Sequence, residues 1–122
     1  MSEDLADKKC VPCKGGIPPM SPGAVYGMLA TLEGWQLEDN KKLFKSYRFE
    51  DFMGPVGFVN EIAKVAEEEG HHPDLYVRWG EVRAYIWTHK IDGLTESDFF
   101  MAAKIDRVFN RLAAQQSQTH NK

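Results

Sequence analysis

Three histidines stand at positions from which a side chain could transfer protons. His71 and His72 are adjacent and follow a predicted helix, and His89 ends a predicted strand. Imidazole titrates near neutral pH, so clustered histidines can both donate and accept protons under physiological conditions. Positions at the ends of rigid elements are commonly used for such chemistry. The fourth histidine, His120, lies in a polar C-terminal tail and is discounted.

Spacing alone leaves other interpretations of these histidines open. His71-His72 before Pro73 is compatible with a solvated connector, and His89 is compatible with a surface residue that follows a strand. A metal site is less favoured, because adjacent histidines do not easily point at one ion from a regular element and no third and fourth ligands are evident. The pattern therefore favours proton transfer or a structural role over metal binding.

An acidic cluster precedes the histidine pair. Glu67, Glu68 and Glu69 occupy the C-terminal turn of a predicted helix, where the helix dipole disfavours each carboxylate by about 0.3–1 kcal/mol. Either this turn is solvated and tolerates the cost, or one carboxylate faces the histidines. In the second case the carboxylate favours the imidazolium form and prepares a general acid. We take this second interpretation as a hypothesis for Glu67.

Asp98 also has two interpretations. It lies three residues after Thr95, so it fits a capping box at the start of the last helix, with Asp in place of the usual Glu. Alternatively, it orients a histidine or binds an amino group of a substrate. Local sequence alone favours capping.

The only cysteines, Cys10 and Cys13, form one C-x-x-C pair. A structural zinc site needs four ligands. A redox pair of the thioredoxin type needs a βαβ context, whereas Pro- and Gly-rich sequence follows this pair. The pattern therefore favours two reduced thiols in a mobile N-terminal segment.

Length and composition indicate one small globular domain. The chain has 122 residues, of which 43% are hydrophobic and 27% charged, and a domain of this size gains stability from oligomerisation. The net charge of −3 and the lack of a Lys/Arg cluster argue against a nucleic-acid partner. The N-terminus is charged, unlike a secretory signal, and no apolar run approaches the roughly 18 residues of a membrane span. We expect a cytoplasmic protein with no membrane partner.

The N-terminal third is predicted to hold an arm, a short helix and a hairpin. Residues 1–20 are expected to form a flexible arm, since glycines and prolines punctuate its end. Ser21-Pro22 is typical of a helix start, and Gly34 is expected to end that helix. Asp39-Asn40 is a turn signal between two extended runs. In the second run, one face carries Leu43, Lys45, Tyr47 and Phe49.

The strongest helical pattern lies between Asp51 and Gly70. Asp51 can cap its start, Pro55 is early enough to be tolerated in or near the first turn, and Gly70 is expected to end it in a left-handed conformation. Apolar residues at steps of three and four predict its buried stripe. That stripe consists of Phe52, Val56, Val59, Ala63 and Ala66, widened by Ile62.

The C-terminal half is predicted to hold a second hairpin and a final helix. Strands are expected at 75–79 and 81–88, with Gly80 at the turn between them. The last strand has Val82, Ala84 and Ile86 on one face and Arg83, Tyr85 and Trp87 on the other. Thr95 opens the last helix, and residues 115–122 are expected to form a frayed polar tail. The helix stripe consists of Met101, Ile105, Val108 and Leu112, broadened by Phe99, Ala102 and Phe109.

These elements predict an α+β fold for a domain at residues 21–114. Tight turns join neighbouring strands, so the four-stranded sheet should be mainly antiparallel with helices packed on one face. Both faces of the last strand carry bulky side chains, which favours a sheet that a subunit partner covers in part.

The candidate residues together resemble the pterin-4a-carbinolamine dehydratase family. That family's pattern is an acidic residue, three spacers, His-His-Pro, a hairpin, Thr/Ser-His and Gly-Leu-Thr-x-x-Asp. Here it reads Glu67, His71-His72-Pro73, Thr88-His89 and Gly93-Leu94-Thr95-Glu96-Ser97-Asp98. The similarity extends to Gly34-Trp35, Phe49-x-x-Phe52, Gly57-Phe58 and Ala102-Ala103-Lys104-Ile105-Asp106. A whole constellation at matching spacing is far more specific than a single motif.

The resemblance implies a reaction and a set of roles. The reaction is dehydration of 4a-hydroxytetrahydropterin to quinonoid dihydropterin, which recycles the cofactor of aromatic amino-acid hydroxylases without a metal, cofactor or prosthetic group. His71 and His89 would form the acid/base pair on either side of the pterin ring. His72, the third catalytic candidate, would bind and orient the ring and could share in proton transfer. Glu67 and Asp98 would contact the histidines and fix their tautomer and charge. The proline that follows the histidine pair would set the direction of the loop.

The resemblance also implies an assembly and leaves two rival functions. Sheets of the family join across a dimer, and some members form tetramers, so we expect a homodimer or homotetramer. Some members serve as dimerisation cofactors of a homeodomain transcription factor, which makes a non-catalytic interaction protein one alternative. A molybdopterin-related pterin enzyme that uses the same pocket is the other.

Overall fold

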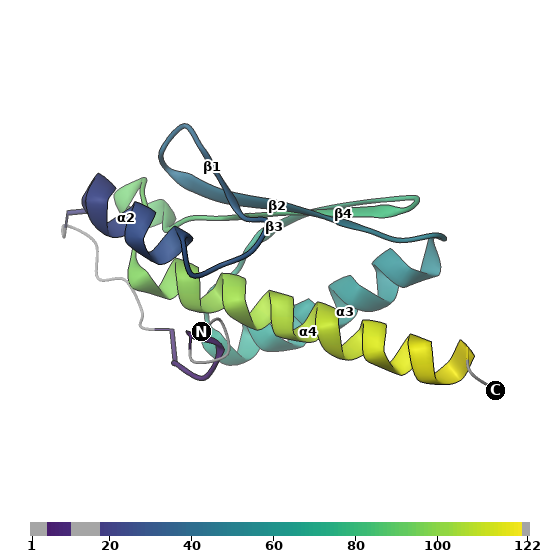
Figure 1. Cartoon of the computed structure of the whole chain (residues 1–122). Helices are drawn as coiled ribbons and strands as arrows, with labels where there is room; N and C mark the ends of the chain where they lie inside the picture. The colour runs from purple at the N-terminus through teal and green to yellow at the C-terminus, as the bar shows by residue number, and fades with distance from the viewer. Residues whose placement is uncertain (1–4, 11–17, 121–122) are drawn as a thin grey trace.

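The structure is a computed structural model that describes residues 5–10 and 18–120, with side chains as far as Gln115. One antiparallel sheet lies on a layer of helices (Figure 1). Within the described residues, no helix is both long enough and apolar enough to cross a membrane. In chain order the elements are α2 (Pro22–Leu29), β1 (Gln36–Glu38), β2 (Lys42–Arg48), α3 (Met53–Glu69), β3 (Asp74–Arg78), β4 (Glu81–Ile86), the 3₁₀ turn η1 (His89–Ile91) and α4 (Glu96–His120).

The sheet has the strand order β1-β2-β4-β3, and every neighbouring pair is antiparallel. Helices α3 and α4 run beneath one face of it (Figure 1), which confirms the predicted α+β architecture. The register places Leu43 of β2 opposite Ile86 of β4, and both side chains are fully buried. The core therefore lies between the sheet and these two helices. Its largest members include Phe58, Ile62, Phe99, Met101 and Ile105.

Turn residues behave as the sequence predicted at the two hairpins. Asp39 and Asn40 both adopt left-handed conformations, with φ of 55° and 57°, and Gly80 has a φ of 75°. Gly34 is also left-handed, at 79°, but the prediction that it ends the first helix is wrong. Helix α2 ends at Leu29, and Gly34 instead turns the chain into β1, because a left-handed glycine serves any tight turn and not only a helix end.

The buried stripe of α3 differs from the predicted one. Phe58, Ile62 and Ala66 are buried, whereas Phe52 is about half exposed and Ala63 is exposed. The Phe58 ring packs against the rings of Tyr47, Phe49 and Phe109 at centroid distances of 4.8, 5.6 and 5.4 Å. One large aromatic ring buries more apolar area than several small residues, so it sets the rotation of the helix.

The C-terminal end of α3 agrees with the prediction, and Asp51 contacts the first turn, although the N-cap position is Phe52. The Asp51 carboxylate accepts a hydrogen bond from the backbone N–H of Gly54 at 2.8 Å. Gly70 has a φ of 63° and donates its backbone N–H to the carbonyl of Ala66. This left-handed residue directs the chain away from the helix axis, and the histidine pair follows immediately.

The described parts of both terminal segments differ from the prediction. Helix α4 continues past Gln115 to His120, although a frayed tail was expected there. In the N-terminal arm, Ala6 is buried in the core, and its carbonyl accepts a hydrogen bond from Lys104 Nζ at 2.6 Å. The described part of the arm is therefore packed rather than free. Cys13 lies outside the described residues.

Asp106 ties the first hairpin to α4. Its carboxylate accepts hydrogen bonds from Trp35 Nε1 at 3.0 Å, Lys45 Nζ at 2.8 Å and Tyr47 Oη at 2.6 Å. Burial and the nearby Asp106 charge raise the pKa of Tyr47 well above its ordinary value, so its hydroxyl remains a donor. This network fixes β2, and through it β4, relative to the helix that carries Asp98.

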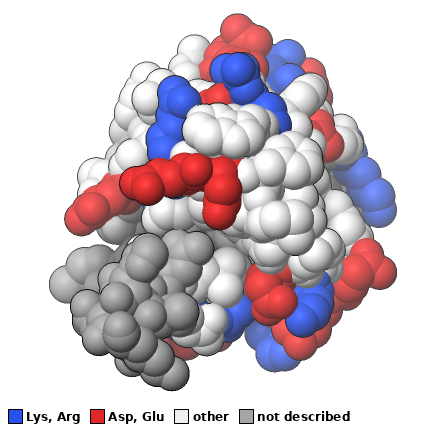
Figure 2. Space-filling view, turned by 90° about the vertical axis from the view of Figure 1, so that its right-hand side faces the viewer, with Lys and Arg blue, Asp and Glu red and all other residues white. Residues whose placement is uncertain are grey.

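The end of the molecule where α3 begins exposes apolar side chains. The β3–β4 turn contacts the segment before α3, since the Gly80 N–H donates to the carbonyl of Asp51 at 3.0 Å. Trp79, Phe52 and Met53 are all exposed around this contact. Figure 2 shows a broad uncharged area at this end, bordered by basic and acidic side chains.

The corrected stripe of α3 can be tested by stability measurements. We expect Phe58→Ala to lower the free energy of unfolding by about 3–5 kcal/mol, because it leaves a cavity in the aromatic cluster. The matched change Phe52→Ala, on the predicted but exposed position, should cost about 1 kcal/mol or less. Urea denaturation of both variants measures the difference, and equal losses would contradict the observed packing.

Candidate active site

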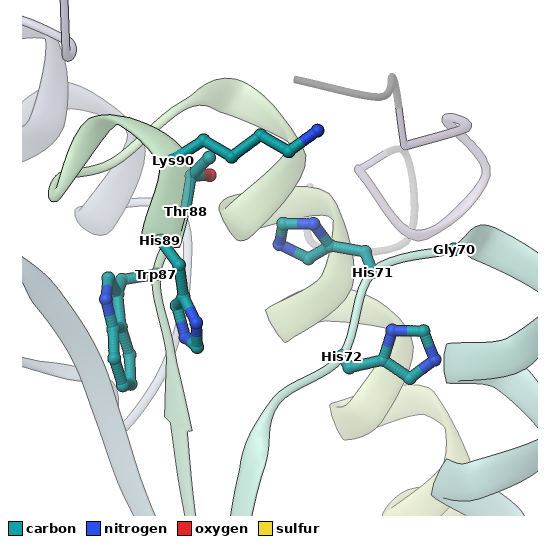
Figure 3. Close-up of a pocket in the computed structure, with 7 residues that line it drawn as sticks. All are labelled: Gly70, His71, His72, Trp87, Thr88, His89 and Lys90. Atoms are coloured by element: carbon teal, nitrogen blue, oxygen red, sulfur yellow. The ribbon is translucent and has the colours of Figure 1, made fainter. Parts of the chain in front are cut away.

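The ends of α3 and β4 meet around a pocket of about 340 Å³. Gly70 turns the chain out of α3 and brings His71 and His72 to one side, while the residues after β4 bring His89 to the other (Figure 3). This volume falls within the range of small-molecule sites. The lining consists of Gly70, His71, His72, Trp87, Thr88, His89 and Lys90.

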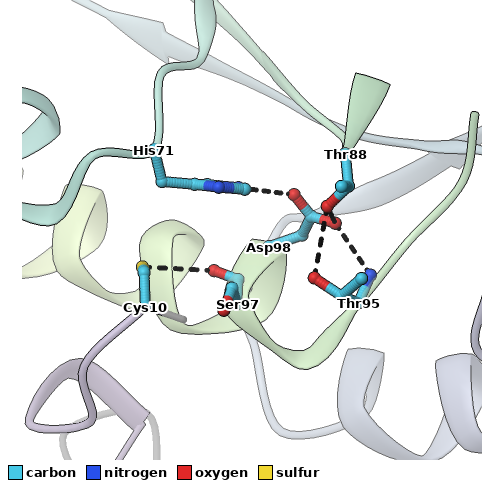
Figure 4. A network of polar contacts seen from close by, with 6 residues as sticks. All are labelled: Cys10, His71, Thr88, Thr95, Ser97 and Asp98. Atoms are coloured by element: carbon cyan, nitrogen blue, oxygen red, sulfur yellow. Dashed lines mark hydrogen bonds and ion pairs between the residues drawn. The ribbon is translucent and has the colours of Figure 1, made fainter. Parts of the chain in front are cut away.

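His71 is held by a buried carboxylate. Its Nε2 lies 2.6 Å from Asp98 Oδ1, and the His71 and Asp98 side chains are 15% and 0% exposed. The other oxygen, Asp98 Oδ2, accepts hydrogen bonds from Thr88 Oγ1 and from the backbone N–H of Thr95, both at 2.8 Å (Figure 4). Asp98 thus caps α4 and contacts a histidine, so the structure combines the two interpretations that its spacing allowed.

This contact defines the tautomer of His71. An ionised Asp98 only accepts hydrogen bonds, so His71 Nε2 carries the proton and donates to it. The basic nitrogen of the neutral ring is then Nδ1. When that nitrogen takes up a proton, the carboxylate stabilises the resulting imidazolium, as it does in catalytic Asp–His pairs. This geometry therefore allows His71 to exchange a proton at Nδ1.

His89 is oriented by an aromatic stack. Its ring lies 4.1 Å from the ring of Trp87, with an angle of 32° between the two planes. Lys42 Nζ lies 4.3 Å from the centroid of the Trp87 ring. Lys42 directly precedes Leu43, which pairs with Ile86, so the sheet register brings this lysine beside Trp87. The stack fixes the ring of His89 at the wall of the pocket.

His72 makes a separate contact on the outer side of the site. Its Nε2 lies 2.6 Å from Glu67 Oε2, and the two side chains are 57% and 79% exposed. A carboxylate of the acidic cluster therefore does face a histidine, as hypothesised for Glu67. The pair is solvated, so its contribution to stability is small. Figure 3 shows the His72 ring directed toward α3, away from His89.

Pro73, the remaining predicted site residue, and the pocket residues that were not predicted lie in the segments that carry the histidines. Pro73 is partly buried between the histidine pair and β3, and it does not line the pocket. Four residues line the pocket without having been predicted as site residues: Gly70, Trp87, Thr88 and Lys90. The only sequence signal for these residues was their position beside His71 or His89, because residues adjacent to a site histidine often share its cavity. Among the described residues, no three His, Cys, Asp or Glu side chains converge as metal ligands would.

Comparison with known proteins identifies the family. The family model described as pterin 4 alpha carbinolamine dehydratase matches residues 18–108. The chain belongs to this family. A protein of Rickettsia bellii (strain OSU 85-389) is 52% identical over 107 residues, which cover 87% of this chain and 95% of that protein. A protein of Rubrobacter xylanophilus is 49% identical over 108 residues, 88% of this chain and 100% of that protein. Both names assign the proteins provisionally to pterin-4-alpha-carbinolamine dehydratase.

One solved structure supports the same membership in the dehydratase family, and a second shares the fold. A Brucella melitensis protein described as a transcriptional coactivator/pterin dehydratase has a TM-score of 0.70 and 30% identity, and the match covers 74% of this chain and 97% of that one. A pterin dehydratase-like protein described as a RuBisCO assembly factor in the alpha-carboxysome has a TM-score of 0.55 and 22% identity, covering 63% and 90%. The second likeness concerns the fold alone.

The role of Asp98 in holding the site predicts a large loss of stability for Asp98→Ala. Each donor that remains buried without an acceptor should lower the free energy of unfolding by about 1–3 kcal/mol. The matched change Glu96→Ala, on an exposed residue in the same helical turn, should cost about 1 kcal/mol or less. Thermal or urea unfolding measures both, and similar losses for the two variants would argue against this network.

Proposed function

We propose that this chain is a hydro-lyase that converts 4a-hydroxytetrahydropterin to quinonoid dihydropterin. In this reaction the C4a–O bond breaks, N5 loses its proton, a double bond forms between N5 and C4a, and water leaves. No electrons are exchanged, so the reaction needs no redox cofactor, and in this proposal the histidines supply the proton transfers without a metal. The observation that carries the proposal is that His71, with Asp98 behind it, and His89, stacked on Trp87, line one pocket.

The chemistry requires two proton transfers, and the pocket offers two histidines for them. One imidazolium protonates the leaving hydroxyl, and one neutral imidazole accepts the N5 proton. His71 and His89 come from opposite walls of the pocket (Figure 3), so a flat ring between them can be approached from either side. Exchange with solvent then restores both protonation states. We propose that these two residues share the acid and base roles.

The other predicted residues act on binding and geometry. We propose that His72 contacts the pterin ring from the pocket wall, while Glu67 holds its ring through the 2.6 Å contact. Pro73 sets the path of the chain between the histidine pair and β3. We propose that the product is reduced again for aromatic amino-acid hydroxylation and that the chain acts in the cytoplasm.

Substitution of the two histidines tests the proposal. We expect His71→Ala and His89→Ala each to lower the rate of dehydration by about 10²–10⁴, since each removes one proton transfer. The rate is followed by ultraviolet absorbance, and Lys64→Ala on the exposed face of α3 should leave it unchanged. If the folded native chain does not accelerate the reaction, the proposal fails.

A failure of that kind would favour an interaction protein, as the description of the Brucella melitensis protein includes a coactivator role. Trp79, Phe52 and Met53 have exposed apolar side chains that such a role could use. In that case His71→Ala would leave partner binding intact. Turnover of a molybdopterin-related substrate, instead of 4a-hydroxytetrahydropterin, would favour the other alternative.

We also propose that two copies of the chain join their sheets into one. Of the two edge strands, β3 is longer than β1, and four of its five residues are exposed. Tyr76 and Val77 on this strand are exposed large side chains. An unprotected edge of this kind is suited to pairing with another strand. Pairing of β3 with β3 of a second copy would give a dimer, which could associate further into a tetramer.

A charge on the β3 edge tests this assembly. Tyr76→Lys should raise the dimer dissociation constant by about tenfold or more, because it places a lysine at the pairing strand. Tyr26→Lys changes a similarly exposed tyrosine on α2 and should leave the constant unchanged. Sedimentation equilibrium measures both. A monomeric native chain, or a dimer that Tyr76→Lys does not weaken, would contradict the proposed pairing.

A further inference from the structure

The described start of the N-terminal arm, residues 5–10, lies outside the matched family region, residues 18–108, yet it is anchored beside the candidate site. Ala6 is buried in the core, and Leu5 and Cys10 pack against that core. The anchoring side chains come from the last turn of α3 and the first half of α4. These two helices also position the His71–Asp98 pair.

Glu69 and Lys104 form the centre of this anchor. Their side chains are 10% and 12% exposed, and Lys104 Nζ lies 3.9 Å from Glu69 Oε2. Lys104 also donates to the carbonyl of Ala6 at 2.6 Å, and Glu69 Oε1 accepts the backbone N–H of Cys10 at 2.9 Å. These partners offset the unfavourable position of the Glu69 carboxylate at the helix C-terminus. One member of the acidic cluster therefore holds the arm and does not face the pocket.

Cys10 contacts both segments that carry the His71–Asp98 pair. Its backbone N–H contacts Glu69, which lies two residues before His71. Its Sγ donates to the carbonyl of Ser97 at 3.5 Å, and Ser97 directly precedes Asp98. Figure 4 shows Cys10 and Ser97 on one side of the same network that joins His71 to Asp98. The arm thus contacts the chain next to both partners of the 2.6 Å bond.

The state of the Cys10 thiol agrees with a structural contact. Burial, followed by the nearby Glu69 charge, raises its pKa from the ordinary 9.0 to about 12. The group is therefore a neutral thiol at physiological pH and can donate to a carbonyl. A thiol in this state is a poor nucleophile, because the thiolate is the reactive form.

We infer that the arm is a positioning element of the site, with Glu69 and Cys10 as its positioning residues. By bonding to both helix ends, it keeps His71 and Asp98 at their contact distance. Neither residue touches the pocket, so the arm acts on the geometry of His71 and not on substrate binding. The effect on turnover rests on the proposed dehydration, whereas the effect on the His71–Asp98 bond does not.

Glu69→Ala and Glu68→Ala form a matched pair that tests this inference. Both remove one carboxylate from the same helical turn, but Glu68 is exposed. Glu69→Ala should lower kcat by about 5- to 20-fold with little change in KM, since a small displacement of a catalytic group is costly. Glu68→Ala should behave like the native chain. Glu69→Gln, which keeps an oxygen for the Cys10 N–H, should recover part of the loss.

A readout that needs no substrate is the low-field proton NMR signal of His71 Nε2–H, which reports its bond to Asp98. This signal should be present in the native chain and in Glu68→Ala, and broadened or lost in Glu69→Ala. If Glu69→Ala does not fold, Cys10→Ala decides, because it removes the thiol contact with Ser97 and keeps the backbone N–H that bonds to Glu69. About a twofold fall in kcat with a shifted His71 signal is expected.

The outcomes separate the two claims. The role of the arm is overturned if the native chain is active and a folded Glu69→Ala or Cys10→Ala variant has the same kcat and His71 signal as Glu68→Ala. A native chain without activity, whose His71 signal still depends on Glu69, would overturn the dehydratase proposal and support the positioning role.

Discussion

One buried carboxylate, that of Asp98, determines how the site and the fold fit together. Its side chain is fully buried, and its donors come from three segments: His71 after α3, Thr88 after β4, and the backbone of Thr95 before α4. A buried charge is tolerated only where such partners surround it. The ends of two helices and one strand are therefore held in one arrangement, and the histidine that meets this charge is fixed by the same bonds that stabilise the domain.

Features with a local cause could be predicted from the sequence, and features decided by distant packing could not. The left-handed turn at Asp39-Asn40 and the end of α3 at Gly70 follow from residues within a few positions. The rotation of α3 depends on the Phe58 ring meeting Phe109, which lies far along the chain. The packing of Ala6 similarly depends on Lys104. The local spacing of apolar residues does not indicate these distant contacts.

The candidate site also combines features that the sequence predicts with features that only the structure shows. His71 and His89 could be selected because their residue type and their places after regular elements are visible in the sequence. The orientation of each ring could not, since it comes from Asp98 in one case and from Trp87 and Lys42 in the other. The acidic cluster illustrates the limit: Glu67 meets a histidine, whereas Glu69, two residues later, meets the arm. Only the path of the chain in space separates these roles.

The central claim is that His71 and His89 act together on one bound pterin. Its most direct test is an NMR titration of the chain, with nitrogen-15 in its histidine rings, against a stable dihydropterin. The account predicts that the ring signals of His71 and His89 shift along a single binding curve, because both residues line the same pocket. Saturation with the dihydropterin that moves neither signal, or only one of them, would contradict it.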